Sequence, residues 1–273
     1  HTTLQPWKAF PSGGVLGPTD IADAEGGTMF TGGRAAGGKF AVLFASLVSP
    51  SGGLRFSSKF VPFESTPPLS EPVSSTAELA LFAVKGSCGH LLGMESLGTS
   101  GGADANVVDT MFVGNDGSLV GPVTLGCAAG AMFADAVPWG GGWLVALSNG
   151  GALGGGGGEC LDPELGWPDD VQIVVTDGTT FTETATVGAP GGATDVKMAA
   201  RSDGAWVVVG TPPGQVVNGM FLGARITLDG KVDKMFPVGG GDPNLENPMN
   251  GTLTAASLGD QLAVAWVDYG GDK

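Results

Sequence analysis

The carboxylates that could perform acid–base chemistry are dispersed along the sequence. Asp20, Asp135 and Asp195 each stand near the start of an apolar segment, and pairs of carboxylates drawn from different strands cleave glycosidic bonds in many hydrolases. These three residues are our candidates for catalytic groups. Asp20 and Asp195 occupy matching positions in two similar segments of the chain, which favours a structural role such as capping a turn.

A second group of carboxylates follows a run of glycines, Gly154 to Gly158. It contains one tryptophan and five acids, namely Trp167 with Glu159, Asp162, Glu164, Asp169 and Asp170. Crowded oxygen ligands on a flexible segment suit Ca²⁺, for which Asp162, Asp169 and Asp170 are the candidate ligands. Trp167 with Glu159, Asp162 and Glu164 is also a candidate platform for a sugar ring or another partner. A solvated acidic loop is the simpler interpretation.

Histidine and cysteine are scarce. The sequence has two histidines, His1 and His90, and three cysteines, Cys88, Cys127 and Cys160. If His1 were a mature N-terminus, its amine and imidazole could form a three-nitrogen copper site with His90. A histidine pointing into water is the simpler interpretation of His90. A disulfide between Cys127 and Cys160 is our preferred pairing, and three ordinary buried thiols are the alternative.

The charge balance limits the partners. Twelve Lys and Arg residues against 27 Asp and Glu residues give a net charge of −15. Nucleic acids and anionic membrane surfaces would repel such a protein, because both are bound through clusters of basic residues. No apolar run approaches the roughly 18 residues of a membrane-spanning helix. Neutral glycans, cations such as Ca²⁺ and other proteins remain as partners.

Composition favours a folded β protein. Of 273 residues, 50 are Gly and 18 are Pro, while 42% are hydrophobic and 14% are charged. The hydrophobic fraction argues against disorder, and so much Gly argues against helices. The acidic, Gly-rich and Lys-poor character suggests an exported protein with an extracellular, periplasmic or cell-surface location.

The elements that must position these residues recur along the chain. Residues 17–63 match residues 192–238, from Pro18-Thr19-Asp20-Ile21 against Ala193-Thr194-Asp195-Val196 to Lys59-Phe60-Val61-Pro62 against Lys234-Met235-Phe236-Pro237. Further apolar strands are expected at 79–84, 143–147 and 262–267, each as the second strand of its unit. Asp-Gly pairs at 116, 177 and 229 predict tight hairpin turns between strands.

Units of this length with about four short strands resemble the blades of β-propellers. We therefore predict an all-β propeller of about five four-stranded blades, at residues 17–65, 72–125, 130–188, 193–238 and 251–273 plus 1–11. In this arrangement the closing blade is split between the two ends of the chain, because Lys8-Ala9-Phe10-Pro11 resembles the last strand of the fourth unit. The alternatives are a segment of a larger propeller, a second chain that completes the ring, a β-sandwich and a β-helix.

Two long loops are expected on one face of this propeller. Residues 86–105 and 149–170 are predicted to connect second to third strands, and such loops emerge on the same face as the connections between blades. Cys88, Cys127 and Cys160 would then all lie on this face. The sequence thus predicts a non-catalytic binding module that recognises a glycan or protein through its loop-rich face. The alternative is a propeller hydrolase or lyase that acts on polysaccharides with carboxylates in its channel.

Overall fold

The computed structural model describes residues 15–24, 27–36, 40–48, 54–57, 61–62, 71–72, 79–100, 103–114, 118–128, 134–148, 151–152, 170–211, 221–239 and 253–266. Within these ranges all regular structure is β-strand. The strands form sheets of antiparallel neighbours. The all-β class predicted from the composition is therefore confirmed.

The first sheet contains β1 (Val15–Ala24), β2 (Gly27–Ala36), β3 (Phe40–Val48) and β4 (Leu54–Ser57), with β5 (Val61–Pro62) also paired to β3. The second sheet contains β7 (Leu79–Lys85), β8 (Gly89–Ser100), β9 (Ala103–Gly114) and β10 (Leu119–Ala128). Two short strands extend it, because β6 (Glu71–Pro72) pairs with β8 and β13 (Gly151–Ala152) pairs with β10.

The next two sheets are four-stranded meanders, in which each strand pairs with the next one along the chain. The third consists of β11 (Ala134–Trp139), β12 (Gly142–Ser148), β14 (Asp170–Thr176) and β15 (Phe181–Gly188). The fourth consists of β16 (Asp195–Arg201), β17 (Gly204–Gly210), β18 (Phe221–Thr227) and β19 (Val232–Val238). The fifth has two described strands, β20 (Thr254–Leu258) and β21 (Gln261–Ala265).

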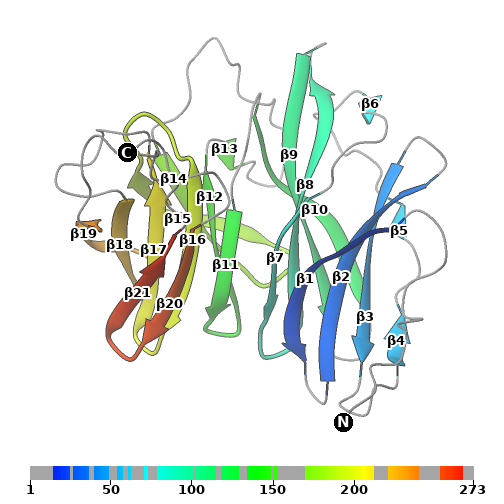
Figure 1. Cartoon of the computed structure of the whole chain (residues 1–273), viewed down its shortest axis with the longest axis horizontal. Coiled ribbons are helices and arrows are strands. Elements are labelled where there is room, and N and C mark those ends of the chain that lie inside the picture. Colours follow the sequence, from blue (N-terminus) through cyan, green and yellow to red (C-terminus); the bar gives the residue numbers. More distant parts are fainter. Residues whose placement is uncertain are drawn as a thin grey trace, which may run out of the picture.

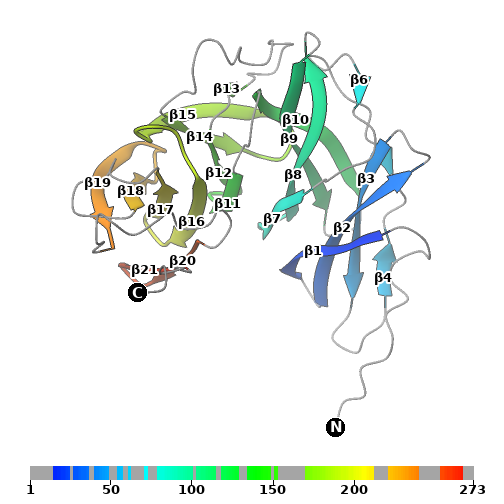
Figure 2. The same cartoon turned by 45° about the horizontal axis from the view of Figure 1, so that its top comes forward.

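The sheets pack through their first strands. β1 packs against β7, β7 against β11, β11 against β16 and β16 against β20. Figures 1 and 2 show the sheets following one another in an arc, with these first strands on its inner side. This is a propeller-like arrangement, and no strand pairing among the described residues closes the arc between β1 and β21.

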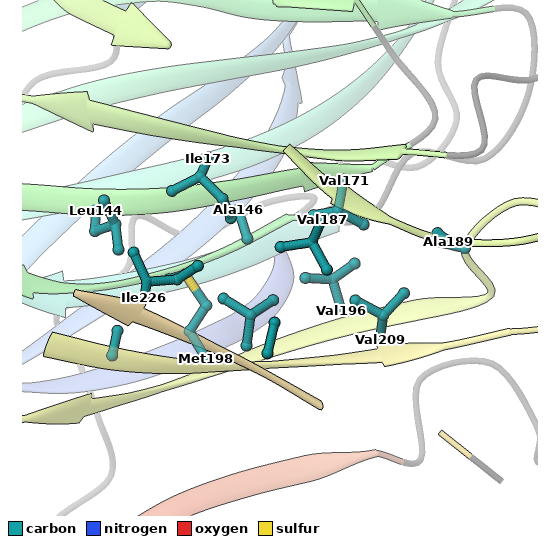
Figure 3. Packing of buried hydrophobic residues seen from close by; sticks show 14 of the residues in the cluster. Leu144, Ala146, Val171, Ile173, Val187, Ala189, Val196, Met198, Val209 and Ile226 are labelled. Carbon is teal, nitrogen blue, oxygen red and sulfur yellow. The ribbon is translucent and has the colours of Figure 1, made fainter. Parts of the chain in front are cut away.

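The core lies between successive sheets. Figure 3 shows the cluster between the third and fourth sheets, where Leu144, Ile173, Val187, Val196 and Ile226 meet. A second cluster between the second and third sheets is formed by residues that include Phe82, Leu91, Trp143 and Val145. Alternate residues of β12 thus serve two different clusters. This explains why second strands such as Trp143–Leu147 are apolar throughout.

Tight turns join the strands where Asp-Gly pairs predict them. Asp177-Gly178 lies between β14 and β15, and Asp229-Gly230 lies between β18 and β19. Gly178 and Gly230 have φ values of 93° and 77°, a conformation that strongly favours glycine. The Asp116-Gly117 pair lies outside the described residues.

Two predictions about the second sheet are wrong. Leu79–Val84 belongs to β7, which is the first strand of its sheet and not the second. Residues 86–105 are not a long loop, because β8 and the start of β9 occupy most of that range. An apolar run marks a strand covered on both sides, and first strands in this fold satisfy that condition as well as second strands do. The predicted second strand Trp143–Leu147 is placed correctly in β12, and residues 262–265 of the predicted strand 262–267 lie in β21.

Candidate functional site

We name the two ends of the sheets by their connections. The loop face is the end where second strands connect to third strands and where one sheet connects to the next. The hairpin face is the opposite end, which holds the turns between first and second strands and between third and fourth strands. Residues 149–169 separate β12 from β14 in the sequence, and within them β13 pairs with β10 at Gly126 and Cys127.

A long hairpin extends the second sheet at the loop face. β8 and β9 have 12 residues each, whereas β12, β14 and all strands of the fourth sheet have seven. Pairing continues to Ser100 opposite Ala103, and β6 joins the outer part of β8 at Gly98 and Thr99. Figure 1 shows this hairpin projecting beyond the neighbouring sheets. The sequence of its outer half is rich in hydroxyl, amide and carboxylate groups.

Asp135 connects the first strands of two sheets. Its Oδ1 accepts a hydrogen bond from the backbone N–H of Ala136 at 2.9 Å. Its Oδ2 accepts one from the N–H of Met198, on β16 of the next sheet, at 2.7 Å. A general acid or base must exchange its proton with a substrate, whereas both oxygens of this carboxylate are engaged by backbone amides. Asp135 thus links β11 to β16 by hydrogen bonds, and we call such a link between first strands a tie.

Asp195 makes a corresponding tie one sheet further along. Its Oδ1 accepts from the N–H of Val196 at 2.8 Å, and its Oδ2 accepts from the N–H of Leu253, next to β20, at 3.4 Å. Lys197 Nζ lies 3.8 Å from Oδ1. The residue is only 5% exposed. Such a buried carboxylate needs these donors to offset its lost hydration.

Counting residues from the hairpin turn pairs Asp20 with a different aspartate from the one that the sequence comparison suggests. Each first strand ends in a hairpin whose second strand begins with Gly27, Gly142 or Gly204. Counted back from that glycine, Asp20 and Asp135 share one position, whereas Asp195 lies two residues earlier. The matching of Asp20 with Asp195 stays a prediction, because Asp135 and Asp195 make corresponding ties although they too differ by two residues on this count. The side chain of Asp20 lies outside the described residues.

Of the histidine and cysteine candidates, the structure describes the side chains of His90 and Cys88. His90 lies within β8, opposite Lys85 and Val113, and is 3% exposed, so the interpretation that it points into water is wrong. Cys88 is an exposed thiol in the turn between β7 and β8, with Sγ 3.8 Å from the carbonyl oxygen of Gly141. This turn belongs to the hairpin face, so the expectation that all three cysteines share the loop face is wrong. His1, Cys160 and the side chain of Cys127 lie outside the described residues, and the Cys127–Cys160 disulfide stays a prediction.

Most of the acidic stretch also lies outside the described residues. This holds for Glu159, Asp162, Glu164, Trp167 and Asp169. Asp170 is the first residue of β14, is exposed and pairs with Gly188. Among the side chains that the structure describes, no three His, Cys, Asp or Glu residues are grouped so that they could hold a metal ion. The proposed calcium ligands stay a prediction.

The sequence did not indicate the charged cluster on the hairpin face. Arg201 Nε lies 2.8 Å from Asp203 Oδ1, and its Nη1 and Nη2 each lie 3.0 Å from an oxygen of Asp260, in the turn between β20 and β21. The guanidinium also lies over the ring of Trp206, with Cζ 4.5 Å from the ring centroid. The hydrogen bond to Asp203 raises the pKa of Arg201 and lowers that of Asp203. The cluster fastens the fifth sheet to the fourth.

A second polar feature of this face is the turn at Asp177. The Oδ1 of this residue accepts hydrogen bonds from the backbone N–H groups of Thr179 and Thr180, each at 2.8 Å, and from both hydroxyl groups. These donors, the Thr179 amide first, hold the pKa of Asp177 well below its ordinary value. The carboxylate stabilises the turn in its ionised form.

Comparisons with protein-family models, with curated proteins and with solved structures found no match to this chain. In the part of the chain that the structure describes, no helix has the length and apolar character needed to cross a bilayer.

Proposed function

We propose that this protein is a binding module with a propeller fold, secreted or exposed at a cell surface, which recognises a neutral glycan or a protein through the loop face. In this proposal about five blades surround a central axis and the closing blade is shared between the two ends of the chain. A segment of a larger propeller, or a ring completed by a second chain, is the alternative architecture.

The projecting β8–β9 hairpin is the observation that carries the proposal. The strands of the fourth sheet span the packed sheets with seven residues each, so β8 and β9, with 12 residues each, are longer than this packing requires. A rigid paired hairpin at the end where the long connections gather offers a surface that requires little ordering on binding. Its polar residue types suit hydrogen bonding to a hydroxyl-rich or mixed ligand.

The positions of Asp135 and Asp195 argue against the enzymatic alternative. Each uses both carboxylate oxygens to accept backbone N–H groups, one of them from the following sheet. An acid–base pair for hydrolysis needs at least one oxygen directed at the substrate. We therefore propose that these carboxylates hold the sheets together and do not turn over a substrate.

The test shortens the hairpin without changing its register. Residues 97–106 are replaced by Asn-Gly, which leaves Ser96 opposite Val107, its present partner, and closes the hairpin with a two-residue turn. Binding to a panel of neutral polysaccharides (glucans, mannans, xylans and galactans) is measured by calorimetry for both proteins. We expect affinity at least about tenfold weaker in the shortened variant, with an unchanged melting temperature.

Leu228→Ser is the matched control, because this residue is exposed in a turn of the hairpin face. The control should bind as the unmodified protein does. Binding that survives the shortening, or that is lost in Leu228→Ser, contradicts the proposal. The same panel is examined for cleavage products, and turnover that Asp135→Asn abolishes without loss of fold would favour the polysaccharide hydrolase or lyase.

A further inference from the structure

In the part of the chain that the structure describes, the fifth sheet has a strand with one unpaired edge. Among the described residues, β12 pairs with β11 and β14, and β17 pairs with β16 and β18. β21 corresponds to these second strands, yet it pairs with β20 alone. An unpaired edge presents a row of N–H and C=O groups that can accept another strand.

The register shows which groups lie at that edge. Leu258 and Gln261 flank the two-residue turn, and the ladder continues to Thr254 opposite Ala265. Hydrogen-bonded and non-hydrogen-bonded pairs alternate along an antiparallel ladder, starting with a bonded pair beside the turn. The N–H groups of Gln261, Ala263 and Ala265 therefore face β20. Those of Leu262 and Val264 face the free edge.

Trp206, on the adjoining face of the fourth sheet, is half-buried. Val208 packs against Leu262 and Val264 of the fifth sheet, and Trp206 lies on the same side of β17 as Val208. Trp206 packs edge-on against Phe236 of β19, with ring centroids 5.5 Å apart. Its Nε1 is buried and has no hydrogen-bond acceptor in the described part of the chain. A buried indole N–H usually has one.

We propose that residues 3–10 of this same chain form a β-strand on the free edge of β21. Lys8-Ala9-Phe10-Pro11 resembles Lys234-Met235-Phe236-Pro237, and the latter lies in β19, the outermost strand of the adjacent sheet. Paired with β21, residues 3–10 would be the outermost strand of a three-stranded closing sheet. A segment of this length can cover the five residues of β21. The inference rests on the proposed propeller fold, in which one end of the chain completes the blade that the other end begins.

Amide hydrogen exchange, measured residue by residue by NMR, tests the pairing. In the intact chain we expect the amides of Leu262 and Val264 to be protected, and in a variant lacking residues 1–11 we expect them to exchange about a hundredfold faster. The amides of Ala263 and Ala265 are bonded to β20 and should lose less protection. A synthetic peptide of residues 1–11 added to the truncated protein should restore the protection of Leu262 and Val264.

If the truncated protein does not fold, Phe10→Asp in the full chain provides a second test of the pairing. It should expose Leu262 and Val264 selectively, because it places a charge in the proposed strand. Lys8→Arg, which keeps the charge and the β-propensity, is the matched control and should leave both amides protected. The amides of Val207 and Val208 in β17, a strand paired on both edges, serve as the internal reference.

Three results would overturn the inference. Leu262 and Val264 could exchange freely in the intact chain, or they could stay protected in both the truncated protein and Phe10→Asp. Their protection could also be lost on dilution at the same concentration at which a dimer dissociates. A second copy of the chain would then be the partner of this edge. None of these results alters polysaccharide binding by the loop face, so failure of this inference and failure of the proposed function are distinguishable.

Discussion

The fourth and fifth sheets begin with the same pair of strands but differ in how far those strands are buried. In both, a two-residue turn joins the first strand to an apolar second strand. Val207, Val208 and Val209 of β17 are all fully buried. Along β21, half-buried residues alternate with exposed ones, and Leu258 in the preceding strand is 74% exposed.

The difference shows that the burial of a strand in this fold depends on its neighbours on both sides. β17 lies between the third and fifth sheets, whereas β21 contacts only the fourth among the described residues. The ties between first strands follow the same trend, because Asp135 reaches the next sheet at 2.7 Å and Asp195 does so at 3.4 Å. The fifth sheet has the sequence of a fully covered blade and the burial of a half-covered one.

Two tryptophans provide the largest expected contrast. Trp143 is fully buried, donates from Nε1 to the carbonyl of Val84 at 3.0 Å and packs against Phe112. Trp143→Ala should lower the free energy of unfolding by about 4 kcal/mol. Trp266 is half-buried against Phe221, and Trp266→Ala should cost roughly 1–2 kcal/mol by the area it buries. Urea titration measures both, and equal losses would contradict the difference between the sheets.

Removing Asp135 should lower the free energy of unfolding more than removing Asp195 does. Asp135→Ala leaves the amides of Ala136 and Met198 without their acceptor, and it should cost about 2 kcal/mol of unfolding free energy. Asp195→Ala removes a longer bond to the fifth sheet and should cost about 1 kcal/mol. Thermal unfolding at neutral pH compares the two variants. A larger loss for Asp195→Ala would indicate that the last interface is as tight as the one before it.

The Arg201 cluster should affect the fifth sheet alone. The side chain of Arg201 is 5% exposed and holds Asp260 across the interface. Arg201→Met should therefore make the amides of β20 and β21 exchange about tenfold faster, while those of β12 change little. High salt should reduce the difference between variant and parent. Faster exchange throughout the molecule would mean that the cluster supports the whole fold.

The smallest expected effect concerns the turn at Asp177, a turn for which the described fifth sheet has no counterpart. Because its pKa is lowered in the folded protein from an ordinary 3.8, the unfolded state binds more protons at low pH. The stability it contributes is complete above about pH 4 and is lost as the pH falls below that value. Asp177→Asn should cost less than about 1 kcal/mol at pH 7, since the turn is exposed, and should cost clearly less near pH 2 than at pH 7. Denaturant midpoints at both pH values test this.

The sequence predicted the β class, the hairpin turns and the equivalence of β12, β17 and β21, because these depend on local patterns of Gly, Asp and apolar residues. It did not predict that Leu79–Val84 is a first strand, because a strand that is covered on both faces has the same apolar sequence pattern in the first and in the second position of a sheet. It also missed the Arg201 cluster, whose members Asp203 and Asp260 are distant in sequence and meet only through packing. The candidate residues 159–169 lie outside the described chain and remain a prediction.

Thiol accessibility at the outer face of β21 tests the central claim that the fifth sheet is a blade covered in the whole protein. Ala263 is exposed in the described chain, and Ala263→Cys places a thiol on that face. Cys88 is an exposed thiol on the hairpin face and serves as the internal standard. Labelling with a soluble maleimide, followed peptide by peptide by mass spectrometry, should modify the thiol at position 263 at least about tenfold more slowly than Cys88. Equal rates at the two sites would contradict the account, because the outer face of the fifth sheet would then be open to solvent.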